Sequence, residues 1–255
     1  MNKPVALITN ALAFAGPPAV AALLKAGFQI VVHDAAFVAS DVIDNYRCAN
    51  PDVMVLAEQT PAAIVEIAWS LSNRLDVLVS NDAYPPIHGS VEAAAVVDLQ
   101  ATLDHLVVFP FEVAKAAIPR LKNQAKARVV FISSNRNQLP VPGGSIPDIA
   151  RAGANALVKS LSIELAPFGI PVNAIAPNYL YSETYYPRAR FVDDAVGRAY
   201  IEQVVPAGRL ARPDEIGELI QYLATMEGTF LTGAIIDFSG GWPVALPFPG
   251  VSPTR

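Results

Sequence analysis

The 255-residue chain contains 53% hydrophobic and only 16% charged residues, a composition that excludes an intrinsically disordered protein. Its formal net charge of −5 and pI near 5.2 leave no basic surface for a phosphate backbone, so we expect no nucleic-acid partner. Because the sequence has no linker-like or low-complexity segment, it predicts one domain over residues 1–255.

Short β-branched runs alternate with longer helical patterns along the chain. The runs typical of strands are residues 5–9, 28–32, 53–56, 77–80, 129–132, 172–176 and about 234–238. The helical patterns cover residues 19–26 and about 62–71, 97–121, 145–166 and 213–226. Nearly every strand residue is apolar, which predicts parallel strands with helices on both faces. The expected fold class is α/β with a doubly wound parallel sheet, whose ligands lie at the carboxyl ends of the strands.

Few features suggest a membrane, a disulfide or a metal. The first residues form neither a signal peptide nor a run of about 18 apolar residues, so we expect a cytoplasmic protein with no membrane contact. Cys48 is the only cysteine and cannot form an internal disulfide. His33, His88 and His105 lack metal-ligand spacing, so no metal site is predicted.

Six sequence blocks resemble those of the short-chain dehydrogenases. They are residues 80–83, 130–134, 150–153, 172–177, 208–216 and 231–233. The resemblance covers almost the whole chain, and the joint spacing of the blocks is more specific than any single block. It implies a single-domain, Rossmann-like fold of the short-chain dehydrogenase type. It also implies a homotetramer assembled through segments 97–121 and 145–166.

The glycine loop of those dehydrogenases, T-G-x-x-x-G-x-G, is altered here. When Thr9 is matched to the motif's threonine, Asn10 and Phe14 occupy the first two glycine positions, and only Gly16 remains. A phenyl ring then occupies space needed by a phosphate. The two prolines at 17–18 remove backbone N–H donors from the helix start that would hold a pyrophosphate. The sequence therefore predicts no cofactor.

The pattern of Thr9, Phe14 and Gly16 is instead similar to the halohydrin dehalogenases, cofactor-independent relatives of the short-chain dehydrogenases. The segments 177–180 and 183–187 continue this resemblance. It implies a halide or nucleophile pocket lined by Phe14, Asn178, Tyr179 and Leu180. Amides and weakly polar ring edges hold a large anion without a full positive charge. The alternative is that Phe14 and Tyr179 are ordinary core aromatics.

The same resemblance implies a catalytic set with the spacing S-x12-Y-x3-R. In that family the serine binds the substrate oxygen, the tyrosine takes its proton, and the arginine lowers the tyrosine's pKa. Ser134 and Arg151 have this spacing, whereas Pro147 stands at the tyrosine position. An arginine remains charged and cannot do the proton-relay work of a lysine. We expect Ser134 and Arg151 to be catalytic, in a set that lacks the family's tyrosine base. The alternative for Ser134 is a simple cap at the end of a strand.

Two residues are candidates to replace the tyrosine. His88 follows the fourth strand on the ligand side of the sheet, and imidazole has a suitable pKa for acid–base work. Asp148 is next to Pro147, but one helical step turns a side chain by about 100°. The alternative is that Asp148 caps the start of the helix, for which Ser145 is the expected N-cap residue.

Other residues are expected to form the substrate side of the pocket. They are Pro86, His88, Arg136, Val141 and Tyr185. Tyr84, Tyr185 and Tyr186 are interpreted as pocket walls, because loop tyrosines more often form walls than bases. Arg136 is a second cation beside the site, or else a solvated loop arginine.

Three functional hypotheses follow. The leading one is a lyase that converts vicinal haloalcohols to epoxides and halide, and opens epoxides with small anions in reverse. The second is a binding protein or degenerate enzyme, favoured by Pro147, and the third is an NAD(P)-dependent oxidoreductase. Cofactor binding separates the third from the others, and halide release separates the first two. The apolar, proline-rich extension over about 240–255 is expected to reach a neighbouring subunit's pocket.

Overall fold

Apolar runs form all seven strands of one parallel sheet in the computed structural model, which describes residues 3–71 and 73–244. The strands are β1 (Val5–Thr9), β2 (Gln29–His33), β3 (Val53–Leu56), β4 (Val77–Asn81), β5 (Arg128–Ile132), β6 (Val172–Pro177) and β7 (Ile235–Phe238). Their order is β3-β2-β1-β4-β5-β6-β7, and each neighbouring pair is parallel. The chain thus winds outward in both directions from β1 and β4, which confirms the doubly wound α/β fold.

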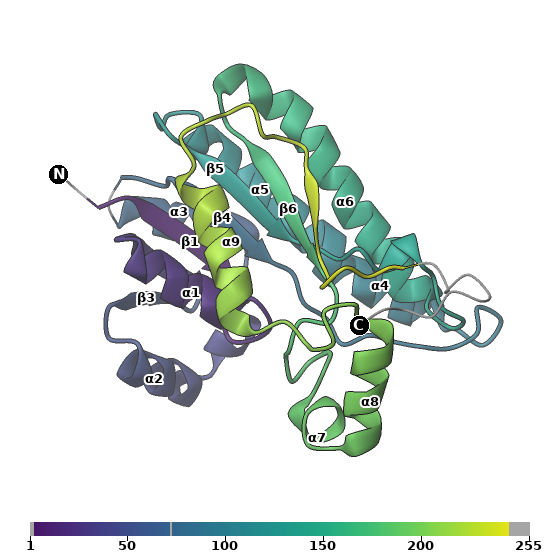
Figure 1. Cartoon of the computed structure of the whole chain (residues 1–255). Coiled ribbons are helices and arrows are strands. Elements are labelled where there is room, and N and C mark those ends of the chain that lie inside the picture. Colours follow the sequence, from purple (N-terminus) through teal and green to yellow (C-terminus); the bar gives the residue numbers. More distant parts are fainter. Residues whose placement is uncertain (1–2, 72, 245–255) are drawn as a thin grey trace.

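Helices cover both faces of this sheet (Figure 1). The helices are α1 (Gly16–Lys25), α2 (Ser40–Ala49), α3 (Pro61–Ser70), α4 (Val96–Leu103), α5 (Phe109–Leu121), α6 (Ser145–Leu165), α7 (Arg188–Phe191), α8 (Ala195–Val204) and α9 (Pro213–Thr225). Successive strand residues point to opposite faces. Ala6 and Ile8 therefore pack in the cluster with α1 and α9, while Val5 and Leu7 pack in the cluster with α3, α5 and α6.

The segment expected as one helix over 97–121 is interrupted. A π-helical turn, Asp104–Val108, separates α4 from α5, and the amide of Phe109 donates to the carbonyl of Asp104. Pro110 follows directly and has no N–H to continue the regular ladder. A widened turn is the usual way to absorb such a break.

Three helices carry little sequence signal and were not predicted. In α2 no residue is fully buried, and only Val42, Ile43 and Tyr46 pack partly against the core. The short helices α7 and α8 lie between β6 and α9, beside the carboxyl end of the sheet (Figure 1). They bury Gly197 and Ile201 but present no wide apolar face.

The carboxyl ends of β1, β4, β5 and β6 lie side by side, because these strands are neighbours and parallel. The loops that follow them therefore meet at one edge of the sheet. None of the helices in the described part of the chain is long and apolar enough to cross a membrane. Of the expected C-terminal extension, residues 245–255 lie outside the described residues.

Candidate active site

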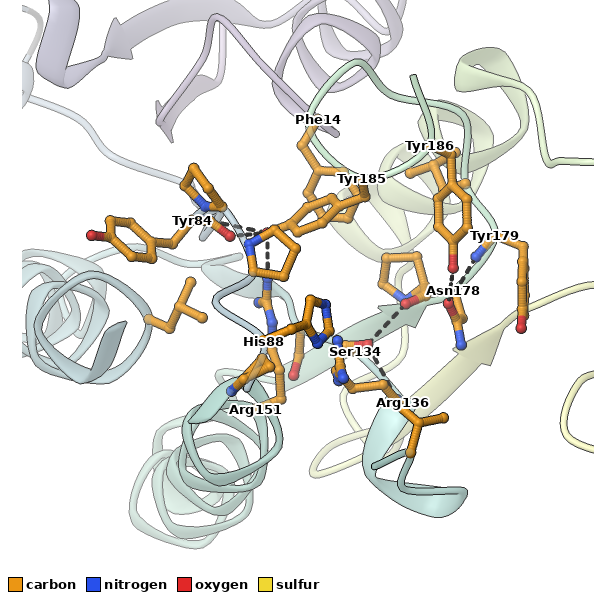
Figure 2. A pocket seen from close by; sticks show the side chains of 18 of the residues that line it. Phe14, Tyr84, His88, Ser134, Arg136, Arg151, Asn178, Tyr179, Tyr185 and Tyr186 are labelled. Atoms are coloured by element: carbon orange, nitrogen blue, oxygen red, sulfur yellow. Dashed lines mark hydrogen bonds between the residues drawn. The ribbon is translucent and has the colours of Figure 1, made fainter. Parts of the chain in front are cut away.

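A cavity of about 280 Å³ opens at this edge of the sheet. The loops after β1, β4, β5 and β6 and the first turns of α6 contribute its walls (Figure 2). Of the residues predicted for the site, the cavity is lined by Phe14, Pro86, His88, Ser134, Arg136, Val141, Pro147, Arg151, Asn178, Tyr179, Leu180 and Tyr185. Four strand-end loops, distant in sequence, thus bring the catalytic and halide-site candidates into one enclosure.

Ser134 lies just beyond the end of β5. Its Oγ donates to the carbonyl oxygen of Pro177 at 3.1 Å and accepts the amide of Arg136 at 3.2 Å. The side-chain Nδ2 of Asn155 on α6 donates to the carbonyl oxygen of Ser134 at 3.1 Å, and Oδ1 of the same side chain accepts from the Ser133 hydroxyl. These contacts hold the backbone of Ser134 in place, so its hydroxyl can exchange Pro177 for a substrate oxygen at small structural cost.

Arg151 is a buried cation on α6, with only 4% of its surface exposed. Its Nη1 donates to the carbonyl oxygen of Ile132 at 3.4 Å, and its Nη2 donates to the hydroxyl of Tyr185 at 3.0 Å. A guanidinium removed from water needs partners such as these. The second contact joins α6 to the loop after β6 and was not foreseen in the sequence.

Asp82 is a buried carboxyl group near Arg151 that sequence reasoning did not select. The Ser80 hydroxyl lies 3.0 Å from both of its oxygens. Burial raises the pKa of Asp82 to about 7, although the Ser80 hydrogen bond and the positive charge of Arg151 act in the opposite direction. Both protonation states of Asp82 are therefore populated near neutral pH, beside the candidate catalytic arginine.

Tyr185 is fixed at both ends of its side chain. Its hydroxyl donates to the carbonyl oxygen of Tyr84 at 3.0 Å and accepts the amide of the same residue at 3.0 Å. Its ring meets that of Phe14 edge-on, with centroids 4.9 Å apart. Its backbone amide donates to the Ser182 hydroxyl, and Ser182 and Tyr186 form an antiparallel bridge. The hydrogen bonds of the hydroxyl to Tyr84 and Arg151 are drawn in Figure 2.

The proposed anion pocket is built from aromatic rings and one amide. Asn178 Oδ1 accepts the Tyr186 hydroxyl at 2.6 Å and the Tyr179 amide at 3.0 Å, so the Nδ2 end of this side chain is its hydrogen-bond donor. Burial raises the pKa of both Tyr179 and Tyr186, which keeps these phenols neutral. Neutral donors and ring edges suit an anion that a nearby phenolate would repel.

Backbone strain is concentrated at this pocket. Phe14 has φ of 55° and Tyr179 has φ of 56°, in the left-handed region that bulky residues rarely adopt. Strain of this kind persists where the surrounding structure determines it, and it gathers at functional sites. Phe14 and Tyr179 both line the cavity, and Tyr179 also packs against Ile201 and Val205.

The two expected substitutes for the missing base differ in placement. Asp148 forms an ion pair with Arg136 and stands outside the set of residues that line the cavity. His88 lines the cavity and is exposed. Arg136 is neither solvated nor a free cation, since its charge is balanced by Asp148. The helix α6 begins at Ser145 with Gly144 at the N-cap position, so Ser145 is not the cap that the sequence suggested.

The loop after β1 uses its amides internally. The amide of Leu12 donates to the Asp34 carboxylate at 2.9 Å, that of Ala15 to Asn81 Oδ1 at 3.3 Å, and that of Gly16 to the carbonyl of Ala13 at 3.0 Å. The next two residues, 17–18, are prolines and have no N–H. The start of α1 therefore lacks the array of amide donors that binds a phosphate.

The described residues, 3–71 and 73–244, contain no group of three or more His, Cys, Asp or Glu side chains placed to hold a metal ion. His33 is buried against the Phe109 ring, and His105 stacks on Tyr84. Burial lowers the pKa of His33. These two imidazoles have packing roles.

Comparison with known proteins places these features in context. A family model described as enoyl-(acyl carrier protein) reductase matches residues 16–243. The human dehydrogenase/reductase SDR family member 4 is 30% identical over 72% of this chain, and the match spans 65% of the human protein. The cis-4-hydroxycyclohexanecarboxylate dehydrogenase of Sinomonas cyclohexanicum is 30% identical over 93% of this chain and 96% of its own length.

A solved structure adds a second kind of relative. A halohydrin dehalogenase with ethyl (2S)-oxiran-2-ylacetate bound superposes with a TM-score of 0.93. It is 32% identical, and the match covers 96% of this chain and all of the other, at 100%. The curated relatives are thus oxidoreductases by name, whereas this structural relative holds an epoxide.

Proposed function

The chain belongs to the short-chain dehydrogenase/reductase family, and we propose that within this family it is a cofactor-independent halohydrin dehalogenase. It would convert vicinal haloalcohols into epoxides, halide and a proton. The observation that carries the proposal is the shared cavity, in which Ser134 and Arg151 face an aromatic pocket containing Phe14 and Tyr179.

The family's fold implies a nicotinamide dinucleotide, and the residues present do not fit this cofactor. The loop amides that would hold its pyrophosphate are bonded to Asp34, Asn81 and Ala13. The ring of Phe14 fills part of the adjoining cavity, and Asp34, which follows β2, is engaged by two amides, those of Leu12 and Ala36. The proposed reaction therefore uses only groups of the protein and the substrate.

The chemistry follows from the placement of these groups. The Ser134 hydroxyl binds the substrate oxygen, and the buried charge of Arg151 stabilises the negative charge that develops when the substrate loses its hydroxyl proton. The oxygen attacks the neighbouring carbon, a C–O bond forms, and the carbon–halogen bond breaks with its electron pair on the halide. The halide enters the pocket of Phe14, Asn178, Tyr179 and Leu180. In reverse, a small anion leaves that pocket to open an epoxide.

The substrate's carbon chain would lie against the remaining walls. Pro86 and Val141 supply apolar surface, and His88 and Tyr185 add polar edges to it. The ion pair of Arg136 with Asp148 leaves little net charge there. Such walls favour a small, neutral haloalcohol or epoxide over an acidic substrate.

A protein that binds anions without turnover is the second candidate. Pro147 favours it, because this cavity-lining residue has no proton to give or to take. The two candidates differ in one measurable respect, which is whether halide is released.

The test is halide release from 1,3-dichloro-2-propanol in the absence of nicotinamide. We expect release by the unaltered protein and a loss of about 10²-fold or more in kcat for Ser134→Ala, since one donor to a developing oxyanion is removed. Ser70→Ala, at the exposed last residue of α3, is the matched control and should retain full activity. Bromide binding without any release would support the binding protein. Oxidation of the alcohol to the ketone with reduction of added NAD+, and no halide release, would support an oxidoreductase.

A further inference from the structure

The proposed reaction needs a base, because the substrate hydroxyl must lose its proton as the ring closes. The cavity wall at α6 does not supply one. Pro147 lies four residues before Arg151 on the same face of this helix, and both residues are buried. A proline side chain carries no titratable group, so the base must come from another element.

The geometry around Arg151 identifies this element. Arg151 Nη2 donates to the hydroxyl oxygen of Tyr185 at 3.0 Å, and the amide of Tyr84 donates to the same oxygen at 3.0 Å. Two N–H donors, one of them a buried cation, thus point at one phenol oxygen (Figure 2). These two donors fix the orientation of the phenol oxygen beside the buried guanidinium.

We propose that Tyr185 is the catalytic base of this enzyme, a phenol supplied by the loop after β6 and oriented by Arg151 and Tyr84. The inference rests on the proposed dehalogenase function. Tyr185 first loses its hydroxyl proton, now donated to the Tyr84 carbonyl, to water in the cavity. The resulting phenolate takes the proton of the substrate hydroxyl while the substrate oxygen closes on carbon and halide departs. The protonated Tyr185 then returns that proton to water, so that one halide and one proton leave for each epoxide formed.

The position of Tyr185 is fixed well enough for this role. Its ring packs edge-on against Phe14, and its amide is bonded to Ser182, a buried residue bridged to Tyr186. A catalytic side chain must be held within about 0.5 Å of its productive position, which a free loop tyrosine would not be. Ser134 and Tyr185 line the same cavity, as two groups that share one substrate oxygen must.

Four other titratable residues of the cavity fit the role less well. Tyr179 and Tyr186 are kept neutral, because burial raises the pKa of each. The ring of Tyr84 stacks on His105, and the backbone of Tyr84, not its phenol, faces Tyr185. His88 is exposed, whereas the oxygen of Tyr185 is held directly by the buried guanidinium.

The experiment compares halide release and bromide binding in four variants of the full chain. Tyr185→Phe removes only the phenol oxygen, and Tyr222→Phe, an exposed tyrosine on α9, is its matched control. His88→Gln tests the competing base. The double variant Pro147→Tyr with Tyr185→Phe moves the phenol to α6, one helical turn from Arg151. Bromide quenching of intrinsic fluorescence reports whether the pocket is intact in each variant, independently of turnover.

We expect Tyr185→Phe to lose about 10²-fold to 10⁴-fold in kcat while its bromide Kd stays within about threefold of the wild-type value. The double variant should recover at least about tenfold of that loss, and Tyr222→Phe should keep the wild-type activity. His88→Gln changes a wall of the cavity and should lose at least about tenfold less in kcat than Tyr185→Phe. Wild-type activity that depends on Ser134 but survives Tyr185→Phe, or is abolished by His88→Gln alone, would overturn the assignment of Tyr185 and leave the proposed function standing. No halide release by the wild type would overturn both.

Discussion

Asp82 lies with 2% of its surface exposed and faces the electrostatic field of Arg151. The carboxyl group is stabilised as a neutral acid by burial and as an anion by the guanidinium, and burial has the larger effect. As a result the charge of Arg151 is only partly compensated at neutral pH. That leaves the guanidinium available to polarise groups in the cavity.

The raised pKa of Asp82 predicts a pH-dependent stability. From about pH 4, the unfolded value, to about pH 7, the folded protein keeps a proton on Asp82 that the unfolded chain has released. The free energy of unfolding therefore falls as pH rises through this window, by on the order of a few kcal/mol. Asp82→Asn cannot ionise, so the variant should gain stability relative to the wild type from about pH 4 to about pH 8.

Urea unfolding at three pH values across that window measures the effect. Asp52→Asn, an exposed carboxamide substitution, is the matched control and should run parallel to the wild type. If the free energy of unfolding of Asp82→Asn also varied with pH as that of the wild type does, Asp82 would be ionised in the folded protein across this window.

Some residues of the candidate site were predicted from the sequence, and others were missed for physical reasons. Ser134 and Arg151 were predicted from the S-x12-Y-x3-R spacing of the family that the sequence resembles, and both line the cavity. The partner of Arg151 was not, since Tyr185 is 34 residues away and meets it only through the path of a loop. Tyr185 was predicted as a pocket wall, and its contact with a buried cation could not be derived from residue type. Asp82 was not selected, because its environment depends on how deeply the strand end is buried.

Among the elements, the loop from β1 into α1 shows how backbone geometry shapes the cavity. A Cβ at Gly16 would lie 2.6 Å from the carbonyl oxygen of Ala11, so only glycine permits the helix to start this close to the loop. The close approach turns the preceding residues sharply and places Phe14 at positive φ. The surviving glycine of the altered motif thus supports the helix rather than a phosphate.

The start of α9 depends on a charged cap. Glu215 accepts the amide of Arg212 at 2.7 Å and pairs with Arg209 at 2.7 Å. These contacts lower the pKa of Glu215 to about 2. The helix α9 packs against α1, which follows the loop that carries Phe14.

Glu215→Ala should therefore destabilise the protein by about 1 kcal/mol, the typical cost of losing a helix cap. Glu218→Ala, an exposed change on the same helix, should have little effect. The stabilisation by Glu215 is present above its unfolded pKa of 4.5 and is lost as pH falls toward 2, so the two variants should converge in acid. Thermal unfolding near pH 2 and near pH 7 measures the stability difference between the two variants. If Glu215 contributed only packing, this difference would be the same at both pH values.

The elements that the sequence predicted best are those with uniform burial. The strands, with both faces covered, and the helices α1, α3, α6 and α9, with one wide apolar face, were placed within a few residues. The break between α4 and α5 was missed, because helical periodicity continues through the π turn before Pro110. The helix α2 was missed because it buries little.

For the whole molecule, one surface is unusually apolar. Large hydrophobic side chains on α4, the π turn, α5 and α6 are exposed: Val96, Val97, Val108, Phe111, Ile149 and Ile163. These elements adjoin one another in the fold. Exposed apolar side chains on adjoining helices are typical of an interaction site. Apart from Val96, they lie on the two segments, 97–121 and 145–166, through which a homotetramer is expected.

We therefore propose that these helices form the subunit interface of a homotetramer. Ile163, with 77% of its surface exposed, should be buried there, and Ile163→Glu should dissociate the assembly. Val38→Glu changes an equally exposed valine next to α2 and should leave the assembly intact. Light scattering after size-exclusion chromatography measures the mass of each variant. A monomeric wild type, or a tetramer unaffected by Ile163→Glu, would contradict this interface.

We propose that this nucleotide-binding fold holds a small anion in place of a dinucleotide. An equilibrium titration with bromide, followed by tryptophan fluorescence, tests this directly, together with a calorimetric titration with NADPH and NADH. Trp242 lines the cavity with its ring centroid 5.8 Å from that of Tyr179, so a bound bromide should quench it. We expect bromide to quench the tryptophan fluorescence saturably in the wild type but not in Trp242→Phe, and neither nucleotide to give a heat of binding. Binding of NADPH or NADH, together with only non-saturating quenching by bromide, would contradict it.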